Sequence, residues 1–210
     1  MKRLVSVAAL ALLVVTVPLL AQSPKGWKVR ADRSTSASDP DGAGAIKFVT
    51  AGSGFHATTP QAAVFWNPAN TITGNYTLKG TFKLLKPSGH TNYYGLVFGG
   101  SDLEGANQNY TYFLVAQDGS WLVKRRNGEA TDNVVAKTPS DAVKKPDASG
   151  QSTNALEVRV LADKLEFAVN GTVVGSAPKT GAAAKTDGIY GIRSNHLLDI
   201  EVDGLSAAKR

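Results

Sequence analysis

The segment LEVRVLADKLEFAVNGTVV, residues 156–174, decides the fold class because apolar and polar residues alternate on both sides of a short turn. Alternation with a period of two places one apolar set on a single face of two strands: Leu156, Val158, Val160, Leu165, Phe167 and Val169. Ala162-Asp163-Lys164 turns the chain between these strands. Asn170-Gly171 precedes a third strand, since Asn-Gly favours the positive φ angles of a tight hairpin turn. The segment therefore predicts three antiparallel strands with one buried face.

The same alternation recurs along the chain, and long helical periodicity is missing. Further strands are expected over residues 44–50, 75–85, 92–100, 109–117, 120–126, 188–194 and 196–207. The polar segments 30–44 and 138–152 are expected to be loops. Many short strands at hairpin spacing predict an all-β fold, an antiparallel β-sandwich or jelly roll.

The N-terminus has the pattern of a secretory signal peptide. Lys2 and Arg3 precede an uncharged apolar run over residues 4–20, and a small residue, Ala21, ends it. We expect a signal peptide over residues 1–21, a single β-sandwich domain over residues 22–210, and a secreted or periplasmic location. An uncleaved anchor is the alternative, because the run is close to the lower limit of about 17 residues for a membrane span. After signal removal we expect no stable membrane span.

Composition excludes several kinds of chemistry. The 210 residues contain no cysteine, which rules out thiol catalysis, Cys-ligated zinc and disulfides, so the fold must rest on packing. The formal net charge is +6, but the basic residues are scattered, and the densest group is Lys124-Arg125-Arg126. Nucleic-acid binding requires a concentrated basic stripe or a recognisable module, so no nucleic-acid partner is expected.

Three segments resemble a known superfamily: residues 156–174, YYGLVFGG at residues 93–100, and DGIYGIRSNHLLDIEVDGLSA at residues 187–207. They are similar to strands of the concanavalin A-like lectin/glucanase (laminin G-like) superfamily. Within it, the chain most resembles the secreted bacterial 3-keto-disaccharide hydrolase type domains. The resemblance extends from about Phe48 to the end and implies a concanavalin A-like jelly roll. It says little about activity, because function depends on sites that differ between proteins of one fold.

The resemblance also implies an aromatic and polar concave face that binds a glycan or oligosaccharide. Sugars present apolar C–H faces ringed by hydroxyls, which match rigid rings and polar side chains respectively. The candidate ligand-binding residues are Tyr93, Gln117, Trp121, Arg125, Tyr190 and Arg193. Trp121 is expected to form a flat platform with Arg125 as a fork of donors beside it. The alternative is that part of this set lies in the core, because alternation sends every second side chain inward.

Two sets of carboxylates are weighed for catalysis. Asp102 and Glu104 lie in a loop after an expected strand, and are the catalytic candidates if the protein is an enzyme. An ordinary polar loop is the alternative. Asp199, Glu201 and Asp203 alternate on the last strand and are expected on its solvated face.

A structural calcium ion is considered on two grounds. Asp39 and Asp41 precede Gly42, a faint likeness to an oxygen-rich calcium loop. The superfamily resemblance adds Asp203, near the C-terminus. The three histidines are isolated in sequence without zinc spacing, and are expected on the surface or in loops.

Together these features predict a secreted or periplasmic carbohydrate-binding β-sandwich protein. Two alternatives stay open: a glycan-active hydrolase of the 3-keto-glycoside type, and a structural envelope or adhesion module without a sugar site.

Overall fold

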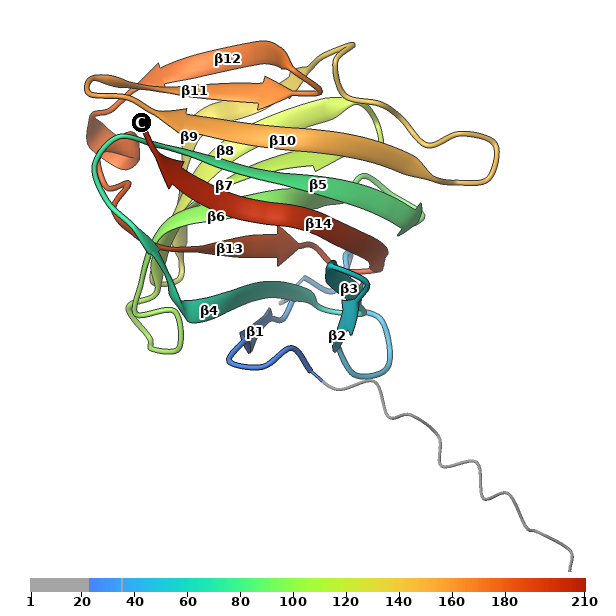
Figure 1. The fold of residues 1–210 in the computed structure, drawn as a ribbon. Coiled ribbons are helices and arrows are strands. Elements are labelled where there is room, and N and C mark those ends of the chain that lie inside the picture. Colours follow the sequence, from blue (N-terminus) through green and yellow to red (C-terminus); the bar gives the residue numbers. More distant parts are fainter. Residues whose placement is uncertain (1–22, 35) are drawn as a thin grey trace, which may run out of the picture.

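Two antiparallel seven-stranded sheets form the protein in a computed structural model that describes residues 23–34 and 36–210 (Figure 1). Sheet A has the strand order β1-β4-β13-β6-β7-β8-β9, and sheet B has the order β12-β11-β10-β5-β14-β3-β2. The predicted all-β sandwich is therefore confirmed. The signal peptide expected over residues 1–21 lies outside the described residues.

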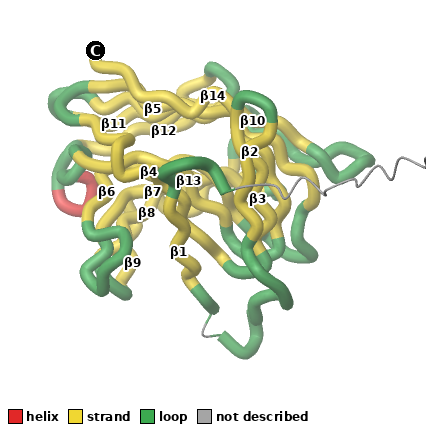
Figure 2. The backbone as a smooth tube through the Cα atoms, turned by 60° about the horizontal axis from the view of Figure 1, so that its bottom comes forward, coloured by secondary structure: helices red, strands yellow, loops and turns green. Residues whose placement is uncertain are grey.

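Sheet A contains β1 (Lys28–Asp32), β4 (Ala62–Ile72), β13 (Gly188–Ser194), β6 (Tyr93–Ser101), β7 (Asn109–Ala116), β8 (Ser120–Asn127) and β9 (Ala130–Pro139). Sheet B contains β12 (Thr172–Pro178), β11 (Lys164–Val169), β10 (Ser152–Val160), β5 (Tyr76–Lys86), β14 (Leu198–Lys209), β3 (Gly54–Thr59) and β2 (Lys47–Ala51). The helix of Figure 2 is a single 3₁₀ turn, η1 (Gly181–Ala183). Among the described residues, no helix has the length and apolar character that crossing a membrane requires.

The hairpin that predicted the fold supplies much of the core between the sheets. β10 pairs with β11 so that Leu156 lies opposite Val169 and Val158 opposite Phe167, and the predicted apolar face is fully buried. The Phe167 ring of sheet B packs on Phe113 of sheet A, with 5.2 Å between ring centroids. The two inner faces thus meet in one apolar core, the arrangement of a β-sandwich.

Sheet A is apolar on its outer face as well. Along β7, Phe113 and Val115 belong to the core between the sheets, whereas Tyr112 and Leu114 belong to a second buried cluster. Successive side chains of a strand point to opposite faces, so the second cluster lies on the outer face of sheet A. An outer sheet face normally carries polar side chains, and this exception locates the candidate site.

Candidate functional site

The outer cluster of sheet A is built by neighbouring strands, together with one residue of the β6–β7 loop. Its buried members are Val64, Trp66, Val97, Leu103, Tyr110, Tyr112, Leu114 and Leu122, with Tyr93 and Ile189 partly buried against them. The centroids of the Tyr110 and Tyr112 rings lie 5.7 Å apart. Both rings are buried, with 0% of Tyr110 and 7% of Tyr112 exposed, so they form a second apolar cluster outside the core between the sheets.

The edge strand β1 and the β6–β7 loop close over part of this cluster. Arg30 of β1 donates a hydrogen bond of 2.5 Å to the carbonyl oxygen of Gly105, and Lys28 forms an ion pair with Glu104. Leu103 of the same loop packs into the cluster. The Arg30 hydrogen bond and the buried Leu103 therefore place the loop against the sheet.

Arg193 of β13 is fixed over the aromatic part of the cluster. Its Nη1 donates to Asp32 and to the Tyr110 hydroxyl, at 2.8 Å for the latter. Its guanidinium carbon lies 5.3 Å from the centroid of the Tyr112 ring, within the range of a cation–π interaction. Only 11% of the Arg193 side chain and 9% of the Asp32 side chain are exposed, so this ion pair is largely shielded from water.

The electrostatics keep this pair ionised. Burial by itself would raise the pKa of Asp32, but the charges of Arg193 and Arg126, with hydrogen bonds from Arg193 and Tyr110, together hold that pKa below its usual value. The carboxylate is therefore negative at neutral pH, and it orients the guanidinium. Arg193 thus presents a preset fork of donors at the outer face of sheet A.

A pocket of about 150 Å³ lies beside Arg193. Its lining residues are predominantly polar: Asp32, Ser34, Asp39, Asp41, Ala62, Asn92, Arg193, Asn195 and His196. The pocket connects the Asp32–Arg193 pair of the outer face to a group of acidic and imidazole side chains. Predicted ligand-binding Arg193 and predicted metal-binding Asp39 and Asp41 are separate in sequence, and the structure brings them to one pocket.

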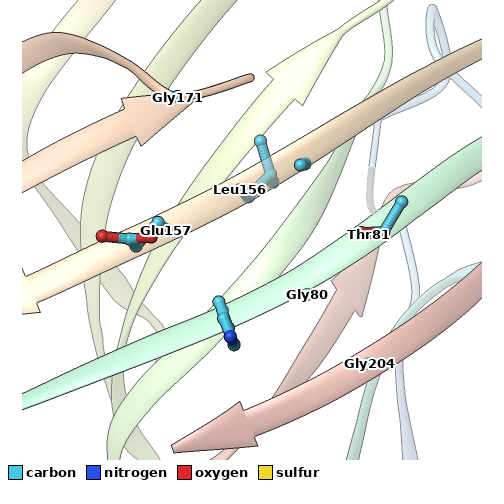
Figure 3. Close-up of a pocket in the computed structure, with 8 residues that line it drawn as sticks. Gly80, Thr81, Leu156, Glu157, Gly171 and Gly204 are labelled. Carbon is cyan, nitrogen blue, oxygen red and sulfur yellow. The ribbon is translucent and has the colours of Figure 1, made fainter.

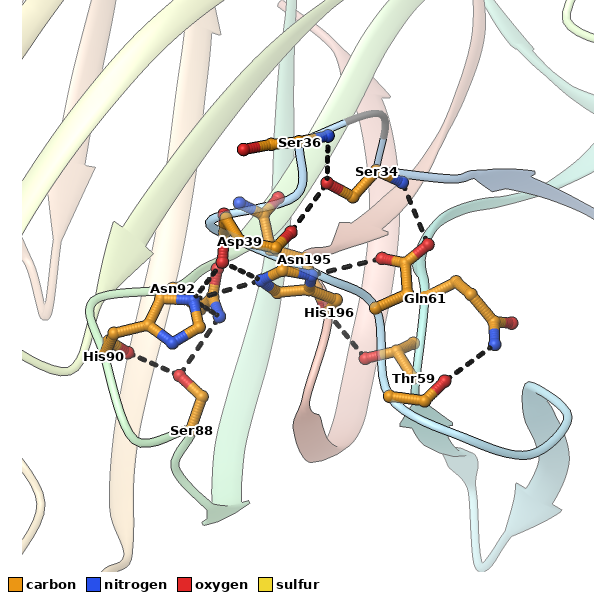
Figure 4. Close-up of polar contacts among 12 residues, drawn as sticks. Ser34, Ser36, Asp39, Thr59, Gln61, Ser88, His90, Asn92, Asn195 and His196 are labelled. Atoms are coloured by element: carbon orange, nitrogen blue, oxygen red, sulfur yellow. Dashed lines mark hydrogen bonds and ion pairs between the residues drawn. The ribbon is translucent and has the colours of Figure 1, made fainter.

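The acidic and imidazole group is shown in Figure 4. His90 Nε2 lies 3.0 Å from His196 Nε2 and 3.0 Å from Asp39 Oδ1, and His196 Nε2 lies 3.1 Å from the same Asp39 oxygen. On the far side of its ring, His196 Nδ1 lies 3.1 Å from Asp41 Oδ1. We call Asp39, His90 and His196, with Asp41 behind His196, the His–Asp cluster.

Contacts around the 34–44 segment fasten the His–Asp cluster to the sheets. The Ser34 amide donates to Asp41 Oδ2 at 2.9 Å, and the Gly42 amide donates to the Pro60 carbonyl at 2.9 Å. Gly42 also lies close to the β13–β14 connection, since a Cβ there would come within 2.6 Å of the end of the Leu197 side chain. The loop expected at residues 30–44 therefore begins only after β1, which includes residues 30–32, and Gly42 ties it to Pro60.

Sequence reasoning did not find the His–Asp cluster. The histidines were expected on the surface or in loops. His90 is exposed in a loop, and His196 lies in the β13–β14 turn but is only 5% exposed, whereas His56 lies in strand β3. His90 and His196 are 106 positions apart and meet only because β6 pairs with β13. A local motif could not show this contact.

Two of the predicted ligand-binding residues lie near the site without lining its pocket. Tyr93 is half-buried against the outer cluster, and its hydroxyl lies 3.2 Å from the Ser120 hydroxyl. The Gln117 amide donates to the Ser88 carbonyl at 2.8 Å. Gln117 therefore supports the loop that carries His90.

The prediction of an exposed Trp121 platform is wrong. The indole is 2% exposed and lies between the sheets, where it packs on Phe113 and Phe167 at centroid distances of 5.8 and 6.0 Å. Its edge closely approaches Gly175, since a Cβ there would lie 2.5 Å from the Trp121 ring. Tyr190 likewise packs against the core between the sheets rather than against Arg193. Alternation correctly placed Trp121 and Arg125 on the same face of β8, but it could not show that this face points into the core.

Like Trp121, Arg125 points to the inner face of sheet A, and it is 5% exposed. Its Nη1 donates to the Thr111 hydroxyl at 2.9 Å and to the Lys185 carbonyl at 2.8 Å, while its Nη2 is buried without a hydrogen-bond partner among the described residues. Burial lowers the pKa of Arg125 to about 10. Two hollows of about 500 and 280 Å³ lie beside it, next to η1. Arg125 is therefore not part of the Arg193 pocket.

The three remaining predicted acidic residues also lie outside the Arg193 pocket. Asp102 accepts a hydrogen bond of 3.2 Å from the Asn107 amide in its own loop, and Glu104 pairs with Lys28. Asp203 accepts a hydrogen bond of 3.0 Å from Ser53 on sheet B. Asp203 therefore does not join Asp39 and Asp41.

A different hollow, of about 280 Å³, lies across β5 and β10 of sheet B (Figure 3). Its lining consists of Lys79, Gly80, Thr81, Ala155, Leu156, Glu157, Gly171 and Gly204. No aromatic ring is among these residues, and Glu157 is paired with Arg159. The Arg193 pocket therefore remains the better candidate.

Comparison with known proteins gives evidence at the level of the fold. The sequence matches no protein-family model, and no curated protein matches it significantly. Three solved structures with TM-scores of 0.60, 0.58 and 0.56 are similar to the chain.

The first is the carbohydrate binding module CBM66 from Bacillus subtilis, 10% identical over 88% of this chain and 96% of that one. The second is the Ca²⁺-bound exoplasmic/lumenal domain of VIP36, 10% identical over 88% and 84%. The third is a GH16 protein of a Bacteroides ovatus mixed-linkage glucan locus, in complex with a product, 8% identical over 90% and 97%. The chain therefore has the concanavalin A-like sandwich fold.

Proposed function

We propose that the protein binds a carbohydrate in the Arg193 pocket and on the adjoining outer face of sheet A near the half-buried Tyr93. The observation that carries the proposal is the guanidinium of Arg193, held by Asp32 and Tyr110 over the Tyr112 ring beside a polar pocket. A preset donor fork beside a polar pocket fits a sugar, which presents hydroxyls at its edge.

The pocket also limits what is bound. About 150 Å³ is below the roughly 300–1,000 Å³ of pockets that enclose a drug-sized ligand. One terminal sugar unit is therefore expected to enter, with Asn92 and Asn195 supplying amide groups, while the rest of the glycan lies on the face near Tyr93.

The fold supports this proposal by analogy. One similar structure is a carbohydrate binding module, and another is a GH16 protein with a bound product. Because proteins of one fold can bind different ligands, the proposal rests mainly on the geometry around Arg193. With the signal peptide expected over residues 1–21, the protein would meet its glycan outside the cytoplasm as a secreted or periplasmic binding protein.

A glycan array followed by calorimetric titration tests the proposal. Arg193→Lys keeps the charge but removes the planar fork, and should weaken binding of an array hit by at least about tenfold, the loss of one charge-assisted hydrogen bond. The matched control is Arg159→Lys, on the outer face of sheet B, which should bind like the wild type. If the wild type binds no glycan, a structural envelope module is favoured instead. If Arg193→Lys binds a glycan as tightly as Arg159→Lys does, the binding site is not the Arg193 pocket.

A glycan-active hydrolase is the second candidate, favoured by the carboxylate and imidazole groups that line the same pocket. Mass spectrometry of an array hit after incubation with the protein would detect cleavage. If cleavage occurs and the Arg193 pocket supplies the catalytic groups, Asp39→Asn should abolish it. If the β6–β7 loop supplies them instead, Asp102→Asn or Glu104→Gln should abolish it.

A further inference from the structure

We infer that Asp39, His90 and His196 form a binding site for a divalent transition-metal ion of the zinc class. The inference does not depend on carbohydrate binding, because it rests on the positions of three donor atoms. It shares Asp39 with the calcium site expected from the sequence, but its other ligands and its chemistry differ.

The three donor atoms form a nearly equilateral triangle. The two Nε2 atoms and Asp39 Oδ1 are separated by 3.0, 3.0 and 3.1 Å. An ion about 2.0–2.1 Å from each atom would see them at angles of roughly 90–100°. This is one face of an octahedron or a slightly compressed tetrahedron, and moving the side chains by a few tenths of an ångström gives either geometry. Two histidines and a carboxylate facing one point are an established ligand set for such ions.

The surroundings of His196 prepare its Nε2 to coordinate. Its Nδ1 lies 3.1 Å from Asp41 Oδ1, and the other oxygen of Asp41 accepts from the Ser34 amide at 2.9 Å. An anionic partner at Nδ1 favours the tautomer with the proton on Nδ1, which leaves the Nε2 lone pair directed at Asp39 and His90. Carboxylate–histidine–metal arrangements use this device to orient the ring and make it more basic.

The donor set selects the class of ion. Calcium takes six to eight oxygen ligands, whereas two of the three donors here are imidazole nitrogens, and Asp203 lies on sheet B. The residues therefore do not fit the expected calcium site. Imidazole suits zinc and its first-row neighbours, and two nearby carboxylates, Asp39 and Asp41, balance a charge of +2.

Three protein ligands leave a coordination position open, as in catalytic zinc sites. Asp39 and His196 line the same pocket as Arg193. A water molecule or a ligand hydroxyl in that pocket would therefore complete the coordination shell. The Asn92 amide nitrogen lies 3.0 Å from His90 Nε2, a contact that coordination of a metal ion by His90 would replace.

The test is direct metal binding by untagged, chelator-treated protein. Competition with a chromophoric chelator measures Zn²⁺ affinity, and the visible absorption of bound Co²⁺ reports its geometry. His90→Ala and Asp39→Asn remove exposed ligands and should leave folding intact. Each should weaken Zn²⁺ binding by at least about 100-fold, since loss of an outer-shell partner alone costs about 10–100-fold. Asp41→Asn should weaken it by about 10–100-fold.

His56→Ala is the matched control, because His56 pairs with Asp199 at 2.5 Å on sheet B, outside the cluster. It should bind Zn²⁺ like the wild type. The inference is overturned if the wild type binds neither Zn²⁺ nor Co²⁺, if His90→Ala and Asp39→Asn bind as tightly as the wild type, or if Ca²⁺ binds more tightly than Zn²⁺. None of these measurements uses a glycan, so failure here leaves the proposed carbohydrate site standing.

Discussion

Trp121→Ala should destabilise the protein strongly without weakening glycan binding. The indole is 2% exposed and packs on Phe113 and Phe167 between the sheets. Truncating a buried Trp removes its transfer free energy and leaves a cavity, so the free energy of unfolding should fall by about 3–5 kcal/mol. Urea titration followed by circular dichroism measures this loss, and calorimetry below the transition measures binding.

Trp121→Phe separates lost packing from lost hydrogen bonding. The indole Nε1 is buried without a hydrogen-bond partner among the described residues. Removing an unsatisfied buried donor recovers about 1–3 kcal/mol, which offsets much of the packing lost with the smaller ring. Trp121→Phe should therefore remain within about 1 kcal/mol of the wild type. A loss below about 1 kcal/mol for Trp121→Ala, together with weaker glycan binding, would refute the internal position.

Three further predictions concern the pocket, the core and the β6–β7 loop. The pKa of Asp32 is lower in the folded state than in the unfolded state, so ionised Asp32 stabilises the fold above the unfolded value of about 4, and this contribution is lost as pH falls through the folded value. In thermal melts, the melting temperature of the wild type should therefore fall more steeply with decreasing pH than that of Asp32→Asn. Gly95→Ala should cost about 1–3 kcal/mol in urea titrations, since its Cβ would lie 2.3 Å from the Phe113 carbonyl oxygen, whereas Gly89→Ala meets no atom within 4 Å and should be near neutral. Glu104→Gln breaks an ion pair whose side chains are 46% and 65% exposed, so its effect on unfolding should stay below about 1 kcal/mol; a larger loss would show that the pair fastens the loop.

The sequence predicted the elements whose signal is local. Alternation and an Asn-Gly turn located β10, β11 and β12, and their predicted core residues are buried. β4 was missed because its apolar residues run continuously. Phe65 enters the core between the sheets while Trp66 enters the outer cluster, so no alternation is visible. β9 was missed because it is a polar edge strand that is half-buried only at a few positions.

The candidate site was predictable only in part, for two physical reasons. Sheet A is apolar on both faces, so alternation along its strands does not show which face is internal. It could not reveal that Trp121 and Arg125 of β8 point inward while Tyr112 of β7 points outward. The His–Asp cluster joins Asp39, His90 and His196 across long sequence separations. Arg193, Asp39 and Asp41 were selected from sequence, but their meeting in one pocket depends on how β1, β4 and β13 pair.

Backbone amide chemical shifts of labelled protein, recorded during titration with a glycan-array hit, test the central claim most directly. If the glycan binds at the Arg193 pocket, the largest shifts should fall at Asp32, Tyr112, Arg193 and Asn195, while Lys79, Thr81 and Glu157 on the outer face of sheet B should stay unchanged. Shifts concentrated on sheet B, or beside Arg125 and η1, would contradict the proposed site.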